Sequence, residues 1–365
     1  MPRARLTLLD PERIRDHFHE QAGWCDALGS PFTAALHRQF ARDFDAGGPV
    51  HDLCADWQGN PRKDALGLRI AGALHHAALD GTAPELAAEY PAARPDWDMD
   101  RVWPVARDWL TTNESHVRTF MQGPPQTNET RRAIILLPGF LELAHRYARP
   151  MHLLELGASA GLNQNWDRFT YDGGNWQRPG RSAVTIRSDW SGPPPAHLDA
   201  VPDVASRAAC DLSPIDLSDP AAVLRLKCYT WADQSERLER LDAAIRLARE
   251  TGVTVERADA AEWVESRLAA RPQDALTVVY HSVFLIYPPA DKIRHIISAI
   301  ETAGTAATDE APLALLCYES EALFGGDRTS PVMQARLRTW PGDDFRLIAT
   351  SDGHVTHVDY CGAAT

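Results

Sequence analysis

The chain has 365 residues, which is long enough for two domains with separate cores. An apolar content of 44% and a charged content of 24% are ordinary for a globular protein. The formal net charge of −13 argues against broad binding to nucleic acid or to an anionic membrane, although it leaves a local basic groove open. We find no signal-peptide core, membrane span, Cys-x-x-Cys pair or zinc spacing. These absences predict a cytoplasmic protein without a metal site.

The first 145 residues predict a helical domain. Several helix starts combine a side chain that can accept from a first-turn N–H with proline at the first helical position. These starts are Asp10-Pro11, Ser30-Pro31 and Asn60-Pro61. One helix is expected from Arg101 to Met121. Asn128 is expected to cap another, built on the apolar Ala133–Leu143, with Glu129 complementing its dipole.

Residues 146–365 show short apolar strands separated by helices, the pattern of a parallel sheet. The expected strands are Met151–Glu155, Ala183–Ser188, Val253–Arg257, Leu276–Tyr280 and Pro312–Tyr318. The segments Phe345–Thr350 and His354–Tyr360 are expected to pair as a terminal hairpin. The predicted fold is therefore α/β: a Rossmann-like, doubly wound, mostly parallel sheet with a C-terminal antiparallel hairpin, preceded by an all-helical N-terminal domain.

The first strand runs into a turn of small residues, Gly157-Ala158-Ser159-Ala160-Gly161. Glycines in such a turn allow backbone N–H groups to approach a ligand. The acidic-x-Gly-x-x-x-Gly pattern that begins at Glu155 resembles motif I of class I S-adenosylmethionine methyltransferases. The Gly-x-Ser-x-Gly pattern matches the nucleophile elbow of α/β-hydrolases. A tight turn without any ligand is the third interpretation. A hydrolase needs several strands before its elbow, and the preceding region is helical, which favours the first interpretation.

Ligands of open α/β sheets lie beyond the carboxyl ends of the strands. Asp189 is the expected partner of a ribose, and Asp259-Ala260 can face an adenine amino group. His281 follows the most apolar strand and is the expected acid/base residue. Each carboxylate can equally cap a helix, and His281 can simply close its strand. The predicted cofactor-binding residues are Glu155, Gly157, Ser159, Gly161, Asn163, Asp189, Asp259 and Ala260.

Several segments together resemble the bacterial domain-of-unknown-function family 2332, over essentially the whole chain. The segments that carry this resemblance are Gln126–Glu129, Leu153–Asn163, Asp167-Arg168, Asp211–Asp216, Trp231–Gln234 with Arg237 and Arg240, and His281-Ser282. The resemblance implies a methyltransferase-like fold behind a helical domain. It departs from the usual methyltransferase motif at Ser159, where a glycine is common.

The same segments suggest where a substrate would bind. Gln126, Asn128 and Glu129 can close over the sheet edge as a lid. Arg237 and Arg240, three residues apart on a helix, can grip an anionic substrate, or can instead pair with the neighbouring glutamates. The remaining predicted substrate-binding residues are Trp231, Asp233 and Gln234.

The function expected from these observations is methyl transfer from S-adenosylmethionine to a small molecule. The main alternative is a serine hydrolase that uses Ser159, with His281, His354 or His357 as its base. The other is a non-catalytic protein that keeps the fold without its cofactor, because fold alone does not give function.

Overall fold

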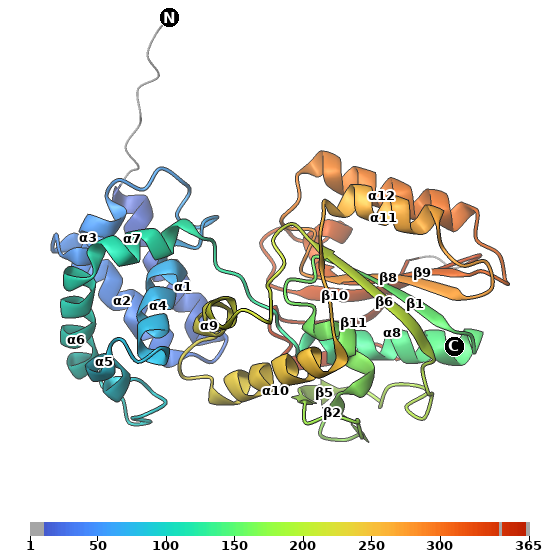
Figure 1. Cartoon of the computed structure of the whole chain (residues 1–365), viewed down its shortest axis with the longest axis horizontal. Helices are drawn as coiled ribbons and strands as arrows, with labels where there is room; N and C mark the ends of the chain where they lie inside the picture. Colours follow the sequence, from blue (N-terminus) through green and yellow to red (C-terminus); the bar gives the residue numbers. More distant parts are fainter. Residues whose placement is uncertain (1–10, 343–344, 363–365) are drawn as a thin grey trace, which may run out of the picture. The chain divides into compact units, whose positions relative to one another are not determined.

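The computed structural model describes residues 11–342 and 345–362 (Figure 1). The chain forms two compact units. A helical unit contains the residues through Thr127 together with Asp219–Glu239, and a sheet unit contains Asn128–Ser218 and Arg240–Thr365. The sequence predicts a single boundary at residue 145. In the structure the helix at 132–147 belongs to the sheet unit, and the 219–239 segment belongs to the helical unit.

The helical unit buries a large apolar core, whose largest members include Phe18, Phe32 and Phe40. Its helices are α1 (Pro11–Ala27), α2 (Pro31–Asp45), α3 (Pro49–Cys54), α4 (Leu66–Leu79), α5 (Pro84–Glu89), α6 (Met99–Thr112), α7 (Glu114–Gln122) and α9 (Pro220–Cys228), and the first turn of α10 (Ser235–Thr251) follows.

Two helix predictions in this unit need correction. The helix expected from Asn60-Pro61 begins only at Leu66, because Oδ1 of Asn60 accepts from the N–H groups of Arg62 and Lys63 and holds a turn there. The helix expected from Arg101 to Met121 is two helices, α6 and α7, which meet at Asn113.

The sheet unit is built on nine strands in the order β5-β12-β11-β10-β9-β8-β1-β6-β7. The strands are β1 (Met151–Leu156), β5 (Asp189–Ser191), β6 (Val204–Asp211), β7 (Glu256–Arg257), β8 (Leu276–Ser282), β9 (Leu313–Ser320), β10 (Met333–Trp340), β11 (Arg346–Ser351) and β12 (His357–Tyr360). The neighbouring strands β7, β6, β1, β8 and β9 are parallel, and β5 is parallel to β12. The strands β9, β10, β11 and β12 form an antiparallel meander. The predicted terminal hairpin is the β11–β12 pair.

The expected second strand, Ala183–Ser188, is not in this sheet. Its centre forms β4 (Thr185–Arg187) in a separate three-stranded sheet with β2 (Thr170–Asp172) and β3 (Gln177–Arg178). The strand beside β1 is β6, which the sequence analysis missed. Its residues VASRAACD have little large apolar surface. The first five positions are all only partly buried or exposed, and four of them carry small or charged side chains.

Helices cover both faces of the sheet (Figure 1). On one face, α8 (Arg132–Tyr147) and the short η1 helix (Leu162–Arg168) cover the side chains of Glu155 and Tyr280, which share a face in the β1–β8 register: Phe140 lies edge-on to Tyr280, with ring centroids 5.3 Å apart. On the other face, α11 (Ala260–Ala269) and α12 (Ala290–Thr305) bury Leu156, Val279 and Leu313. Alternation of side chains along each strand produces this division.

Candidate functional site

The strand order reverses direction at β1. The chain places β6 and then β7 on one side of β1, and β8 and then β9 on the other. In open parallel sheets, ligands bind at such a reversal, outside the carboxyl ends of the strands. The residues directly after β1 begin at Gly157, and β8 carries His281 opposite Leu156. The topology therefore brings the glycine-rich turn and His281 to the same edge of the sheet.

The turn after β1 is held from the β6 side. The N–H of Ala158 donates to the Cys210 carbonyl at 3.1 Å, and the N–H of Ser159 donates to Oδ2 of Asp211 at 2.9 Å. Three positions in the turn have a left-handed backbone: Gly157 (φ +67°), Ser159 (φ +56°) and Gly161 (φ +72°). The Ser159 side chain is only 6% exposed, and its Oγ has no hydrogen-bond partner among the described residues. A buried hydroxyl of this kind can accept a polar ligand group.

The segment before α8 fixes the far end of the turn. Oδ1 of Asn128 accepts from the N–H of Leu162 at 3.0 Å, so Asn128 serves the turn and not the α8 terminus. Nδ2 of Asn163 donates to the Glu129 carbonyl at 3.2 Å. The amide oxygen of Asn163 is buried and finds no partner in the described chain, which makes it a second unsatisfied polar atom beside the turn.

Glu129 and Arg240 form a buried ion pair. Their closest atoms, Oε1 and a terminal guanidinium nitrogen, are 3.2 Å apart, and both side chains are more than nine-tenths buried. Nε of Arg240 also donates to Oγ1 of Thr130. Arg237 has different partners: it donates to Oε1 of Gln234 and lies over the Trp231 ring. Arg240 is therefore paired within the sheet unit, and Arg237 contacts residues near the start of its own helix.

Glu155 is buried between the two central strands. Its Oε2 accepts from the Tyr280 hydroxyl at 3.0 Å. Burial raises the pKa of Glu155 to about 8, with the Tyr280 hydrogen bond opposing the shift and the charge of Asp211 adding to it. At neutral pH the side chain is therefore mainly an uncharged acid.

His281 and Glu319 form the second buried acid–base contact of this edge. Nδ1 of His281 lies 2.7 Å from Oε1 of Glu319, and the two side chains are 3% and 0% exposed. The same carboxylate oxygen accepts from the N–H groups of Phe284, at 2.8 Å, and Leu285, at 3.3 Å. The ring of His281 is therefore held by a carboxylate from the neighbouring strand β9.

Phe284 lies against the glycine turn. A Cβ placed on Gly157 would be 2.3 Å from Cδ2 of Phe284, so only glycine permits this packing. The ring of Phe284 is also 5.8 Å from that of His281, centroid to centroid. One aromatic side chain thus joins the two halves of the candidate site.

The remaining sheet residues predicted for a cofactor are placed differently. The expectation that Asp189 ends the strand beside β1 is wrong: it begins β5, six strand steps away, or roughly 28 Å at the usual spacing. Asp211 ends the neighbouring strand instead. Asp259 follows β7, where it caps α11 through the N–H of Ala261 and pairs with Lys292 at 2.9 Å. Ala260 is the first residue of that helix.

Two of the three histidines considered as the base of a serine hydrolase lie far from Ser159 in the sheet. His357 is in β12, five strand steps from β1, or roughly 24 Å, and His354 precedes that strand. Neither can serve Ser159. His281 is close in the sheet, yet the Ser159 backbone bonds to the β6 side through Asp211, whereas His281 stands on β8.

Comparisons with known proteins give one result. Residues 15–360 match the model of a family described as "Uncharacterized protein conserved in bacteria (DUF2332)". The chain belongs to this family. No curated protein and no solved structure matches it. The DUF2332 match spans both units, so the helical unit is as much part of the family as the sheet unit.

The DUF2332 segment at 231–234 serves the helical unit. Oδ2 of Asp233 accepts from the N–H of Phe32 at 2.9 Å and its other oxygen accepts from Ser30, so Asp233 caps α2. Gln234 donates to the Leu28 carbonyl, and Trp231 packs against the small apolar cluster around Cys25. Gln126 is half-buried in the segment between α7 and α8.

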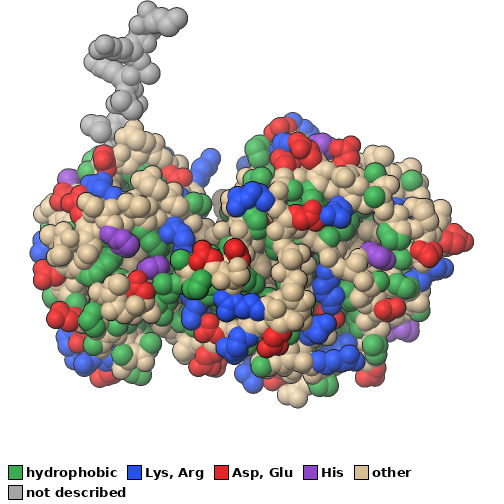
Figure 2. Space-filling view, in the orientation of Figure 1, with side chains coloured by type: hydrophobic (Ala, Val, Ile, Leu, Met, Phe, Trp, Pro, Cys, Tyr) green, Lys and Arg blue, Asp and Glu red, His purple; other side chains and the backbone are tan. Residues whose placement is uncertain are grey.

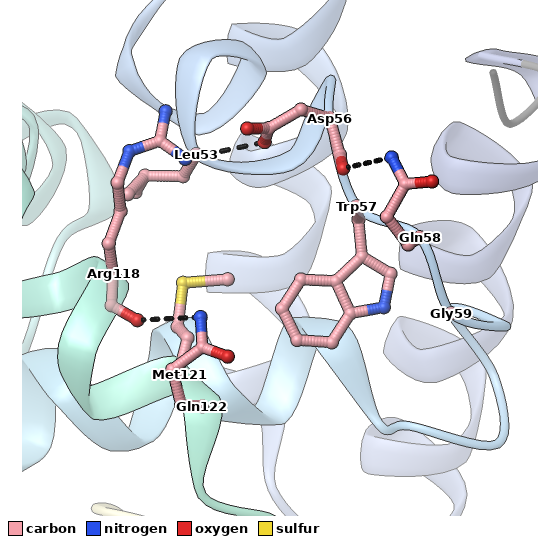
Figure 3. Close-up of a pocket in the computed structure, with 8 residues that line it drawn as sticks. All are labelled: Leu53, Asp56, Trp57, Gln58, Gly59, Arg118, Met121 and Gln122. Atoms are coloured by element: carbon pink, nitrogen blue, oxygen red, sulfur yellow. Dashed lines mark hydrogen bonds and ion pairs between the residues drawn. The ribbon is translucent and has the colours of Figure 1, made fainter. Parts of the chain in front are cut away.

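A pocket of about 440 Å³ lies in the helical unit (Figure 3). Its lining residues are Leu53, Asp56, Trp57, Gln58, Gly59, Arg118, Met121 and Gln122. Arg118 pairs with Asp56 at 3.3 Å and with Glu114 at 2.8 Å. Because its two charged side chains are paired with each other, the pocket presents indole and amide surfaces instead of an unpaired charge.

Charge, hydropathy and metal-ligating side chains add three observations. On the face in Figure 2, acidic and basic side chains are interspersed and form no uniformly basic surface. Within residues 11–342 and 345–362, no helix has the length and apolar character needed to cross a membrane, and no group of three or more metal-ligating side chains gathers.

Three polar residues of the site, and the aromatic Phe284, were not assigned from the sequence. Tyr280 and Glu319 lie inside apolar strands, where a lone polar residue gives no pattern. Asp211 was visible in the family segment Asp211–Asp216, but its strand was not recognised.

Proposed function

We propose that the sheet unit binds S-adenosylmethionine at the carboxyl end of β1 and transfers its methyl group to a small molecule. The observation that carries this proposal is the order of the five parallel strands. Numbered along the chain, β7-β6-β1-β8-β9 is 3-2-1-4-5, the order of nucleotide-binding sheets, with a glycine-rich turn after the first strand.

The residues at the turn fit a nucleoside-type cofactor. Gly157 and Gly161 supply the left-handed backbone of the turn, and Phe284 packs against it at Gly157. Ser159 Oγ and Asn163 Oδ1 are buried without partners and would gain hydrogen bonds from a polar ligand. Asp211, at the end of the second strand, takes the ribose role first given to Asp189. Glu155 is bonded to Tyr280 and, mainly uncharged at neutral pH, offers no charge to the cofactor.

His281 supplies the base in this proposal. Glu319 accepts the Nδ1–H, which leaves the Nε2 lone pair for a substrate proton; no described residue bonds Nε2. S-adenosylmethionine, when bound, supplies an electrophilic methyl group. The role of the protein is to align the substrate nucleophile with that group and to remove its proton at Nε2 of His281.

The substrate is proposed to carry an apolar part. Large apolar side chains are exposed on the loops that follow β6, β8 and β9, all at the carboxyl edge of the sheet: Leu212 (69% exposed), Ile286 (54%), Tyr287 (75%) and Leu323 (42%). Apolar side chains that gather around a candidate site favour contact with an apolar ligand.

A serine hydrolase stays the second candidate, on one observation. Ser159 has the left-handed backbone and the unpartnered hydroxyl that a nucleophile elbow would provide. His281 is the one base of the three expected that the sheet order leaves near it.

Calorimetry and thermal unfolding with S-adenosylhomocysteine, NAD and ATP test the proposal. A ligand present at a hundredfold excess over its Kd stabilises the folded protein by about 2.7 kcal/mol. We expect this shift with S-adenosylhomocysteine alone, weakened in Asp211→Asn and kept in the matched variant Asp189→Asn. Binding of NAD in its place, or equal loss in both variants, would overturn the assignment.

A further inference from the structure

Glu319 is the least exposed acidic side chain of the sheet edge, and one of its oxygens has three donors. Oε1 lies 2.7 Å from Nδ1 of His281 and accepts from the backbone N–H groups of Phe284 and Leu285. Its other oxygen, Oε2, is buried without a partner among the described residues. A buried carboxylate is stable only when hydrogen bonds replace its lost hydration, so its three donors are held firmly.

The two amides belong to a loop, residues 283–289, that crosses the candidate site. The loop starts at Val283, a β-branched residue in the left-handed region (φ +51°), which is a strained conformation. Phe284 then fills the space beside Gly157, and the exposed Ile286 and Tyr287 follow. The ring of Phe284 therefore occupies the side of Gly157 that a closely approaching ligand needs.

We propose that Glu319 is a positioning residue with two targets: it fixes the tautomer of His281, and it holds the 283–289 loop so that Phe284 covers Gly157. One carboxylate then controls both the position of the loop over Gly157 and the orientation of the His281 ring. Ligand entry at Gly157 requires that Phe284 move away, which breaks or lengthens the bonds from its loop to Glu319. The inference deepens the proposed function, since it takes the Gly157 side as the ligand side.

The first experiment needs no ligand. Nitrogen NMR of histidine-labelled protein, with His281→Asn to assign the signal, reports which ring nitrogen carries the proton, and amide hydrogen exchange reports on residues 284 and 285. We expect a proton on Nδ1 of His281 and protected amides in the wild type. Glu319→Ala should lose both, whereas Glu319→Gln, whose amide oxygen can accept the same donors, should recover amide protection.

Circular dichroism of each variant separates local change from unfolding. If Glu319→Ala does not fold, the comparison of Glu319→Gln with the wild type decides, because a retained acceptor should keep the loop amides protected. A wild type with an Nε2–H tautomer, or loop amides that exchange freely, would overturn the inference. If Glu319→Ala changes the His281 tautomer but leaves the exchange of the loop amides unchanged, the proposed control of both by Glu319 is overturned.

The second experiment uses S-adenosylhomocysteine as the probe. Phe284→Ala should leave the His281 signal unchanged. If the open loop makes up about a tenth of the wild-type population, the variant should bind the probe about tenfold more tightly than the wild type does. Unchanged or weaker binding in Phe284→Ala, with measurable binding in the wild type, would contradict the covering role of Phe284. If no variant binds the probe, the proposed cofactor fails, whereas the tautomer and exchange results still decide the role of Glu319.

Discussion

The hydroxyl of Tyr280 donates to the carboxyl group of Glu155 at 3.0 Å, joining the two strands that flank the reversal of the sheet. Both side chains are buried on the α8 face, where Phe140 packs against Tyr280. Burial raises the pKa of Glu155 to about 8, so the folded protein keeps a proton there that the unfolded chain loses near its ordinary pKa of 4.5.

This difference predicts that stability falls as the pH rises. Between about pH 4.5 and 8 the folded state binds more protons at Glu155 than the unfolded state, so the free energy of unfolding decreases across this window and levels off above it. Glu155→Gln removes the titration while keeping an acceptor for Tyr280. Its stability relative to the wild type should rise by a few kcal/mol from pH 5 to pH 8, at about 1.4 kcal/mol per pKa unit. Urea unfolding at several pH values measures this.

Tyr280→Phe is the matched control. It removes the hydrogen bond that lowers the pKa of Glu155, so the decline in stability should extend to higher pH than in the wild type. Parallel pH profiles for the wild type and Glu155→Gln would show that Glu155 does not titrate in this way.

The sequence predicted the central elements of the sheet unit because their runs of apolar side chains indicate burial. The strand at 276–282 is apolar at most positions, and the glycine turn follows β1 as expected. The error lay in β6, whose small and charged residues lack such a pattern; its position depends on long-range pairing with β1. Because of that error, Asp189 and not Asp211 was expected at the end of the strand beside β1.

The site partners were less predictable than the site positions. His281 was expected at the edge from its strand alone, but its contact with Glu319 joins residues 38 positions apart and depends on the β8–β9 register. The pairing of Glu129 with Arg240 likewise spans 111 positions. Spacing in a sequence reports neighbours on one helix or strand, and it carries no information on such distant contacts.

Ser159 separates the two candidate chemistries. Glycine tolerates a φ of +56° without strain, so Ser159→Gly should fold with at least wild-type stability and still bind S-adenosylhomocysteine. Ser159→Val places a β-branched side chain in the same buried position and should lose about 1–3 kcal/mol. Chemical denaturation compares the three proteins.

A fluorophosphonate probe completes this test, because it labels an activated serine. We expect no labelling of the wild type at residue 159. Labelling that disappears in Ser159→Gly would favour the hydrolase over methyl transfer.

The Glu129–Arg240 pair is expected to stabilise the sheet unit and not to bind a substrate. Removing one partner leaves a buried charge without compensation, so Glu129→Gln and Arg240→Met should each cost about 3–5 kcal/mol. The double variant should cost less than the sum, because neither charge then remains. A double-mutant cycle by urea unfolding gives the coupling. Strictly additive effects would mean that the two side chains do not interact in solution.

His281 is predicted to act in turnover and not in cofactor affinity. Its Nδ1 is held by Glu319 within the protein, and its ring stands beside Phe284 at the carboxyl end of β8, so Nε2 is the atom left for a substrate proton. A positioned base contributes roughly 10²–10⁴-fold to rate. His281→Ala should therefore lower methyl transfer on that scale while S-adenosylmethionine binds as in the wild type.

The matched control is His295→Ala, which changes an exposed histidine that pairs with Glu265 on the surface. It should change neither the rate of methyl transfer nor the affinity for S-adenosylmethionine. Calorimetry gives the affinity, and transfer of labelled methyl to an accepted substrate gives the rate. Parallel loss of affinity and rate in His281→Ala would place His281 in the cofactor site, and loss of neither would leave it a structural partner of Glu319.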